Sequence, residues 1–192
     1  MTTKAQAVIL GVFGAAVVLM WGSFRTSEGA AARLNQPVAL LAQDLASGTG
    51  GGAHTGATWT TRVVNKEVYD PSHMVTLAGN QFTLKAGTYL IEAQQTIFGD
   101  IGIPKGFRGR LRNMTDNVTV AISVSVRLHE ETNESATVVS PIPPTLLDLQ
   151  RTTAFELQYY CESADTNPYA LGYGLACGEM ERYASVFIRK LD

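Results

Sequence analysis

The sequence has 192 residues, of which 45% are hydrophobic and 17% are charged, and its formal net charge is −2. This length allows one sizeable core or two small ones, and the low charge together with 18 glycines favours an ordered, β-rich domain over a disordered chain. The near-neutral balance gives no electrostatic reason to expect DNA or RNA as a partner.

The first 26 residues are the most apolar part of the chain. From Ala7 to Gly22 sixteen residues pass without a charge, whereas a bilayer-spanning helix needs about 20 apolar residues, or about 17 at the short end. The run therefore predicts an apolar helix over residues 1–26, of borderline length for a membrane. Its apolar side chains are Ala7, Val8, Ile9, Leu10, Val12, Phe13, Val17, Val18, Leu19, Met20 and Trp21.

Three roles of this helix are compatible with the sequence. Residues 7–24 could anchor the chain in a membrane, with Trp21 at the interface. The helix could instead be buried in the axis of an oligomer or in a socket on another protein. A cleavable signal peptide is the third, because a positive charge precedes the run and small residues follow it. We expect residues 27–36 to be a linker and residues 37–192 to be the folded domain.

After residue 36 the sequence alternates between apolar and polar side chains with period two. This periodicity, interrupted by turn residues, predicts about eight to ten strands and no helix. The expected strands lie at 38–41, 59–64, 74–77, 82–85, 88–98, 107–112, 118–128, 136–139, 152–161 and 181–191. The prolines at 141, 143 and 144 predict a connection, and Leu146–Leu149 either a helical turn or a short edge strand. The pattern is typical of an all-β sandwich or barrel, and no internal repeat suggests a propeller or solenoid.

The stretch from Gln81 to Phe98 is expected to organise the domain. Apolar alternation runs through Phe82 and Leu84, stops at Ala86-Gly87, and then continues for the length of a long strand. Alternation interrupted once by glycine predicts a β-hairpin, with its second strand central in a sheet. One face of that strand is predicted to carry Tyr89, Ile91, Ala93, Gln95 and Ile97.

Residues 47–53 form a glycine-rich segment, SGTGGGA. No Gly-Lys-Ser/Thr follows it and no helical pattern opens after it, so it is not a phosphate-binding loop. We expect a flexible surface loop.

Two strands are apolar on both faces. In the last strand, Tyr183, Phe187 and Leu191 share one face, while Ala184, Val186 and Ile188 share the other. The strand at 118–128 is largely uncharged on both sides. Because a sheet wetted on one side should alternate apolar and polar residues, these strands predict that one face fills the core while the other either meets a second copy of the chain or is buried within the same domain.

Five segments, taken in order, resemble domains of the C1q/tumour-necrosis-factor-like class, most closely the versions in bacteriophage tail fibres, spikes and related virion proteins. The segments are WTTRVVN at 59–65, QFTLKAGTYLIE at 81–92, RLRNMTD at 110–116, FELQ at 155–158 and YASV at 183–186. The resemblance extends over residues 37–191. The chain differs in that only a short linker, and not a long fibre, precedes the domain, and the loop with Cys177 looks peculiar to it.

The resemblance implies an antiparallel, ten-stranded jelly roll that assembles into a homotrimer about a three-fold axis. In such trimers, aromatic and aliphatic residues of the first, central and last strands meet near the axis. The residues of this chain that correspond to such positions are Tyr89, Tyr159, Tyr183 and Phe187.

The sequence contains no recognisable catalytic or metal-binding motif. His54, His73 and His129 stand far apart and lack metal-ligand spacing, so we expect exposed loop residues. The acidic residues near Glu130 lack the spacing of a calcium loop. Cys161 and Cys177 match no zinc pattern, and the sequence leaves open whether they are bonded to each other. We expect no enzyme activity and no cofactor.

Together these features lead us to expect a bacteriophage virion protein: a trimeric fibre or spike whose head binds the host surface and whose N-terminal helix attaches it to other virion proteins. The host partner would be a surface glycan or protein, contacted through loops 99–106, 129–135 and 164–178. Candidate contact residues in these loops are Ile101, Lys105, His129, Glu131, Asn167 and Tyr169. A capsid decoration or tail-hub protein, and a membrane-anchored cellular adhesin on the extracellular face, are the alternatives.

Overall fold

The computed structural model describes residues 36–99, 105–128 and 136–192. The expected N-terminal helix lies outside these residues. Residues Pro37–Asp192 form one compact unit. The described residues contain twelve strands: β1 (Val38–Leu45), β2 (Trp59–Thr61), β3 (Lys66–Tyr69), β4 (Val75–Ala78), β5 (Gln81–Leu84), β6 (Gly87–Gly99), β7 (Lys105–Asn113), β8 (Val118–Ile122), β9 (Val126–Leu128), β10 (Ala136–Leu149), β11 (Thr153–Cys161) and β12 (Glu181–Lys190).

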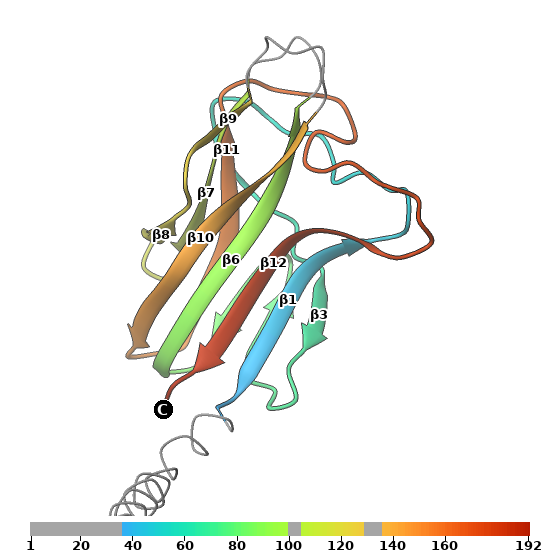
Figure 1. Cartoon of the computed structure of the whole chain (residues 1–192). Helices are drawn as coiled ribbons and strands as arrows, with labels where there is room; N and C mark the ends of the chain where they lie inside the picture. The colour runs from blue at the N-terminus through green and yellow to red at the C-terminus, as the bar shows by residue number, and fades with distance from the viewer. Residues whose placement is uncertain (1–35, 100–104, 129–135) are drawn as a thin grey trace, which may run out of the picture. The chain divides into compact units, whose positions relative to one another are not determined.

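The strands form two antiparallel sheets that face each other (Figure 1). The first sheet has the order β10-β6-β12-β1-β3. The second has the order β4-β5-β11-β7-β8, with β2 added beside β11 and β9 beside β7. The described part of the chain is an all-β sandwich, which confirms that prediction.

The strand order is that of a jelly roll. Eight strands pair in nested fashion: β1 with β12, β5 with β11, β6 with β10, and β7 with β8. The two strands farthest apart in the sequence, β1 and β12, therefore pair with each other, and each further pair lies inside the previous one along the chain. This nesting is that of a long hairpin wrapped into two Greek keys. The described residues give twelve strands, against the ten expected from the resemblance, because short additional strands join both sheets.

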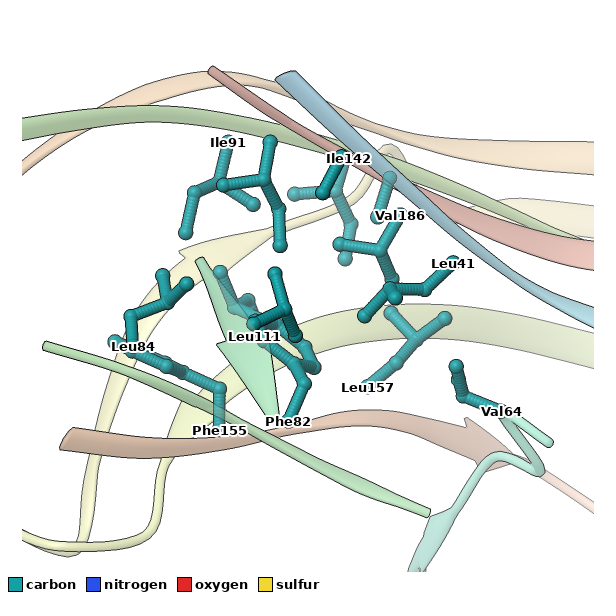
Figure 2. Packing of buried hydrophobic residues seen from close by; sticks show 14 of the residues in the cluster. Leu41, Val64, Phe82, Leu84, Ile91, Leu111, Ile142, Phe155, Leu157 and Val186 are labelled. Atoms are coloured by element: carbon teal, nitrogen blue, oxygen red, sulfur yellow. The ribbon is translucent and has the colours of Figure 1, made fainter. Parts of the chain in front are cut away.

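Large apolar side chains from both sheets fill the space between them. Phe82 of β5 and Phe155 of β11 stack with ring centroids 5.5 Å apart, and both are fully buried. Figure 2 shows them meeting Ile91 and Val186 from the opposite sheet. This is the interdigitated core expected when two sheets pack face to face. The alternation predicted in β6, β11 and β12 is confirmed, since every second residue points into the core.

The hairpin expected between Gln81 and Phe98 is wrong. β5 pairs with β4 and β11 in the second sheet, whereas β6 pairs with β10 and β12 in the first. The turn at Lys85-Ala86 therefore carries the chain from one sheet to the other. The prediction that β6 is a central strand is confirmed.

Two other strands differ from the sequence prediction. β10 runs through the prolines expected to form a connection, and a bulge between Ile142 and Thr145 accommodates Pro143 and Pro144. Because β10 is an edge strand, the missing N–H groups need no ladder partner. The strand expected at 118–128 is interrupted instead. Ser123 turns inward between β8 and β9, and its hydroxyl accepts a hydrogen bond from the Gly109 N–H at 2.7 Å.

The glycine-rich segment is a packed structural element and not the free surface loop that was expected. Its backbone pairs with the loop before β12: the Gly51 N–H donates to the Gly172 carbonyl and the Gly52 N–H to the Pro168 carbonyl, both at 2.8 Å. A Cβ at Gly51 would lie 2.6 Å from the backbone of Leu171. Only glycine allows this close approach, because any larger residue would force the two loops apart.

Candidate interaction surfaces

The residues expected near a trimer axis fall into two groups. Tyr89, Tyr159 and Tyr183 are buried inside the subunit, with 1%, 3% and 5% of their surface exposed. Tyr89 and Tyr159 point into the core and Tyr183 is covered by loops, so none of the three is available to a second copy in this fold. Phe187 is half-buried and points away from the core, on the outer surface of the first sheet. The interior position of the three tyrosines corrects this part of the sequence interpretation.

The Tyr183 side chain packs against two loops, the one that follows β1 and the one that precedes β12. Its hydroxyl donates to the Thr49 carbonyl at 2.7 Å, and its ring lies against Gly172, where a Cβ would come within 2.0 Å. Burial, with a smaller effect from the Glu181 carboxylate, raises the pKa of the Tyr183 phenol to about 12.

The Tyr183→Phe variant is expected to change how stability depends on alkaline pH. The neutral phenol is favoured in the fold, so its contribution is complete below the ordinary value of 10 and is lost as the pH rises through about 12. The wild type should therefore lose stability relative to the variant across this interval. Urea unfolding of both proteins from pH 8 to 12 measures the difference. A constant difference over the whole range would contradict the assignment.

Phe187 is part of an exposed apolar surface on the first sheet, which we call the outer apolar face. Register places Phe187 beside Leu40 of β1, which pairs with Tyr69 of β3, and it places Leu90 of β6 beside Leu146 of β10. Tyr69 and Leu146 are 54% and 64% exposed. A shallow hollow of about 320 Å³ opens beside Phe187, between β6, β10 and β12. Leu40, Leu90 and Phe187 are partly exposed, and Glu92 and Arg189 separate the Phe187 group from the Leu90 group on this face. Exposed apolar patches with polar residues around them mark interaction surfaces.

Most of the predicted receptor contacts either lie outside the described residues or have another role. Ile101, His129 and Glu131 are outside them, and Lys105 begins β7. Asn167 shapes its own loop, because its side-chain oxygen accepts the Tyr169 N–H at 2.9 Å. Tyr169 is half-buried and packs on Tyr173 with ring centroids 5.1 Å apart.

The outer surface of the second sheet has a different character, dominated by arginine and aromatic side chains. Arg108, Arg110 and Arg112 of β7 all point outward, since Phe107 and Leu111, which alternate with them, point into the core. The Arg110 guanidinium lies 4.1 Å from the centre of the Trp59 ring. Its Nε donates to the Gln158 side-chain oxygen at 2.8 Å. Sequence analysis missed this surface, although the alternation in FRGRLR carried the signal.

A hollow of about 600 Å³ lies at one end of this arginine-rich surface. We call it the Trp59 hollow. Its lining residues are Trp59, Gly106, Phe107, Arg108, Ser125, Val126, Arg127, Tyr160 and Glu162. It lies near β9, at the end of the sandwich remote from the C-terminus (Figure 1).

A polar network centred on Glu156 connects β2, β5 and β11, and two of these strands, β2 and β11, also line the Trp59 hollow. The Glu156 carboxylate is 7% exposed and accepts hydrogen bonds from Thr61, Gln81 and Gln158 at 2.6–2.8 Å. These hydrogen bonds, together with the charge of Arg110, outweigh burial and keep the pKa of Glu156 below its ordinary value. The carboxylate is therefore a fixed anchor for the strands that carry Trp59 and Arg110, and it has no role as a proton donor at neutral pH.

Arg62 is fully buried between the sheets, which the sequence did not indicate. Its guanidinium donates to the carbonyls of Leu171 at 2.8 Å and of Thr96 and Tyr183 at 3.3 Å. No ion pair joins it to a carboxylate within the described residues, and burial lowers its pKa to about 10. Arg62 thus fastens the loop before β12 to the sandwich.

The described residues contain no cluster of acidic, histidine or cysteine side chains able to hold a metal ion, and no helix there is long and apolar enough to span a membrane. His73 is exposed, as expected, whereas His54 is buried beside Asp165 and corrects that prediction. Cys161 is buried and Cys177 exposed, and they do not form a disulfide with each other.

Comparisons with known proteins are limited to structure. No family model matches the chain, and no curated protein matches it in sequence. Among solved structures, the chain is similar to murine APRIL at pH 8.0: the match covers 82% of this chain and 100% of the APRIL chain, with 12% sequence identity and a TM-score of 0.49. Murine APRIL at pH 5.0 covers the same shares, with 12% identity and a TM-score of 0.47. The jelly-roll assignment rests on the strand order described above and not on these matches.

Proposed function

We propose that the chain is a homotrimeric attachment protein of a bacteriophage particle, a spike or fibre whose jelly-roll head binds the host surface. The observation that supports it most strongly is the outer apolar face. Leu40, Leu90 and Phe187 lie on a sheet surface that a soluble monomer would leave in water, and a second copy of the chain has the complementary character to cover it. The number of three copies comes from the sequence resemblance.

The arrangement of the chain ends agrees with this role. β1 starts beside the C-terminus, where the Lys190 N–H donates to the Pro37 carbonyl at 2.9 Å. Both ends of the domain therefore lie at one end of the sandwich, and β9 lies at the other (Figure 1). An N-terminal attachment to the particle leaves the opposite end of the head directed outward. Three equivalent sites on one rigid trimer gain avidity through their raised effective concentration.

The test uses the purified full chain and the bacterial strain that serves as host for the phage that encodes this chain. We expect labelled protein to adsorb to these cells and to reduce adsorption of intact particles, and we expect antibodies against the chain to label purified particles. Labelled particles without cell adsorption would favour the role of capsid decoration or tail-hub component. Absence from particles would contradict a virion protein and leave the membrane-anchored adhesin.

A further inference from the structure

We infer that the Trp59 hollow is a binding site for a carboxylated sugar. The inference rests on the proposed attachment function, and it names the chemical class of the surface that the head binds. It concerns residues other than the loop residues expected from the sequence.

The shape of the hollow suits a saccharide of one or two rings. Its volume of about 600 Å³ falls within the range of about 300–1,000 Å³ typical of small-molecule sites. Two cross-strand rows form its floor: Trp59, Tyr160 and Arg108 in one, and Glu162, Gly106 and Arg127 in the next. Gly106 makes room for the Glu162 carboxylate, whose Oε2 accepts the Gly106 N–H at 3.2 Å and would lie 2.8 Å from a Cβ at this position.

The aromatic part of the site is held in place before any ligand arrives. Trp59 and Tyr160 are neighbours on adjacent strands, with ring centroids 5.7 Å apart. Arg110, which does not line the hollow, packs on Trp59 and is itself fixed by Gln158. A site whose side chains are already ordered loses less conformational entropy on binding.

The charged side chains of the hollow can form hydrogen bonds with both the carboxylate and the hydroxyls of a carboxylated sugar. Arg108 donates one long hydrogen bond, 3.4 Å from Nε to the Ser123 carbonyl, and no carboxylate in the described part of the chain pairs with it. Its two terminal nitrogens can therefore receive a ligand carboxylate in bidentate geometry. An Arg127 terminal nitrogen lies 3.8 Å from a Glu162 carboxylate oxygen. At this separation the Arg127 N–H groups can still donate to sugar hydroxyls, and the Glu162 carboxylate can still accept from them.

The combination favours a sugar acid over other anions. Apolar C–H faces of a sugar ring can cover the negative faces of Trp59 and Tyr160, which a bare phosphate or sulfate cannot do. The Glu162 carboxylate in the floor disfavours a highly charged polyanion, whereas it can accept hydrogen bonds from sugar hydroxyls. The hollow opens on the second sheet, so assembly through the outer apolar face of the first sheet leaves it accessible.

The experiment titrates the full chain, purified in mild detergent, with two probes: a galacturonate dimer and a ketodeoxyoctulosonate disaccharide. Each is compared with its carboxyl-reduced counterpart, and calorimetry with tryptophan fluorescence reports binding. We expect saturable binding of at least one acid, weakened about tenfold or more by carboxyl reduction and by Arg108→Ala, because each change removes a charge-assisted hydrogen bond between guanidinium and carboxylate. Trp59→Ala should abolish binding.

Arg112→Ala is the matched control, since Arg112 lies on the same strand and face but does not line the hollow. It should change affinity less than about twofold, and thermal unfolding verifies that all variants fold. The absence of saturable binding, equal affinity for the reduced sugars, or equal effects of the Arg108 and Arg112 variants would overturn the inference. Cell adsorption that neither acid competes would overturn it while leaving attachment intact. Sugar binding without cell adsorption would support the site and overturn attachment.

Discussion

Phe187→Glu is expected to convert the proposed trimer into monomers at micromolar concentration. Phe187 pairs with Glu92 on the outer apolar face, so the variant sets two carboxylates, with Arg189 as a nearby cation, on the surface that the proposed trimer would bury. A carboxylate buried without full compensation costs several kcal/mol, and a trimer would incur that cost three times. Size-exclusion chromatography with light scattering measures the change in mass.

The fold of each subunit should survive this substitution, because Phe187 does not belong to either core cluster. Leu175→Glu is the matched control. Leu175 is 74% exposed in the loop before β12 and belongs to no strand of the first sheet, so the same charge there should leave the mass unchanged. An unchanged mass in the Phe187 variant, beside an associated wild type, would show that the copies meet through another surface.

Phe155→Ala is expected to destabilise the domain by about 3–5 kcal/mol, the usual cost of removing a buried aromatic side chain. Phe155 is fully buried and loses its stacking on Phe82 in this variant. This is a large share of the roughly 5–15 kcal/mol that stabilises a typical domain. Urea unfolding at a fixed protein concentration measures it, since association adds its own contribution.

Two further variants define what the Phe155 result means. Phe155→Leu keeps most of the volume and should cost less than about 1.5 kcal/mol. Leu175→Ala removes an exposed side chain and should change stability by less than about 0.5 kcal/mol. If Phe155→Ala cost no more than Leu175→Ala, the packing between β5 and β11 would not be the core of the sandwich.

Much of the fold could be predicted from sequence because the signal is local. The alternation of Phe155, Leu157, Tyr159 and Cys161 fixes which side of β11 faces the core, and each of these residues is buried. The pairing of strands is not local. Ala86-Gly87 indicates a turn but does not say whether the chain returns to the same sheet, and the expected hairpin was wrong for this reason.

The candidate surfaces were harder to predict for the same physical reason. Periodicity groups Tyr183 with Phe187 on one face of β12, yet loops that come from far along the chain bury Tyr183 and leave Phe187 half-buried. The residues that line the Trp59 hollow come from or adjoin four strands, β2, β7, β9 and β11, which span about a hundred residues of sequence. The hollow also depends on Gly106, whose importance appears only when Glu162 lies beside it. A single sequence contains no signal for such long-range proximity.

The central claim is that the first sheet has a second buried face, formed between copies of the chain. Native mass spectrometry of the wild-type full chain, released from mild detergent at micromolar concentration, tests it most directly. We predict one dominant species of three times the 20.7 kDa chain mass. A monodisperse, soluble monomer under the same conditions would contradict the claim, and with it the proposed spike.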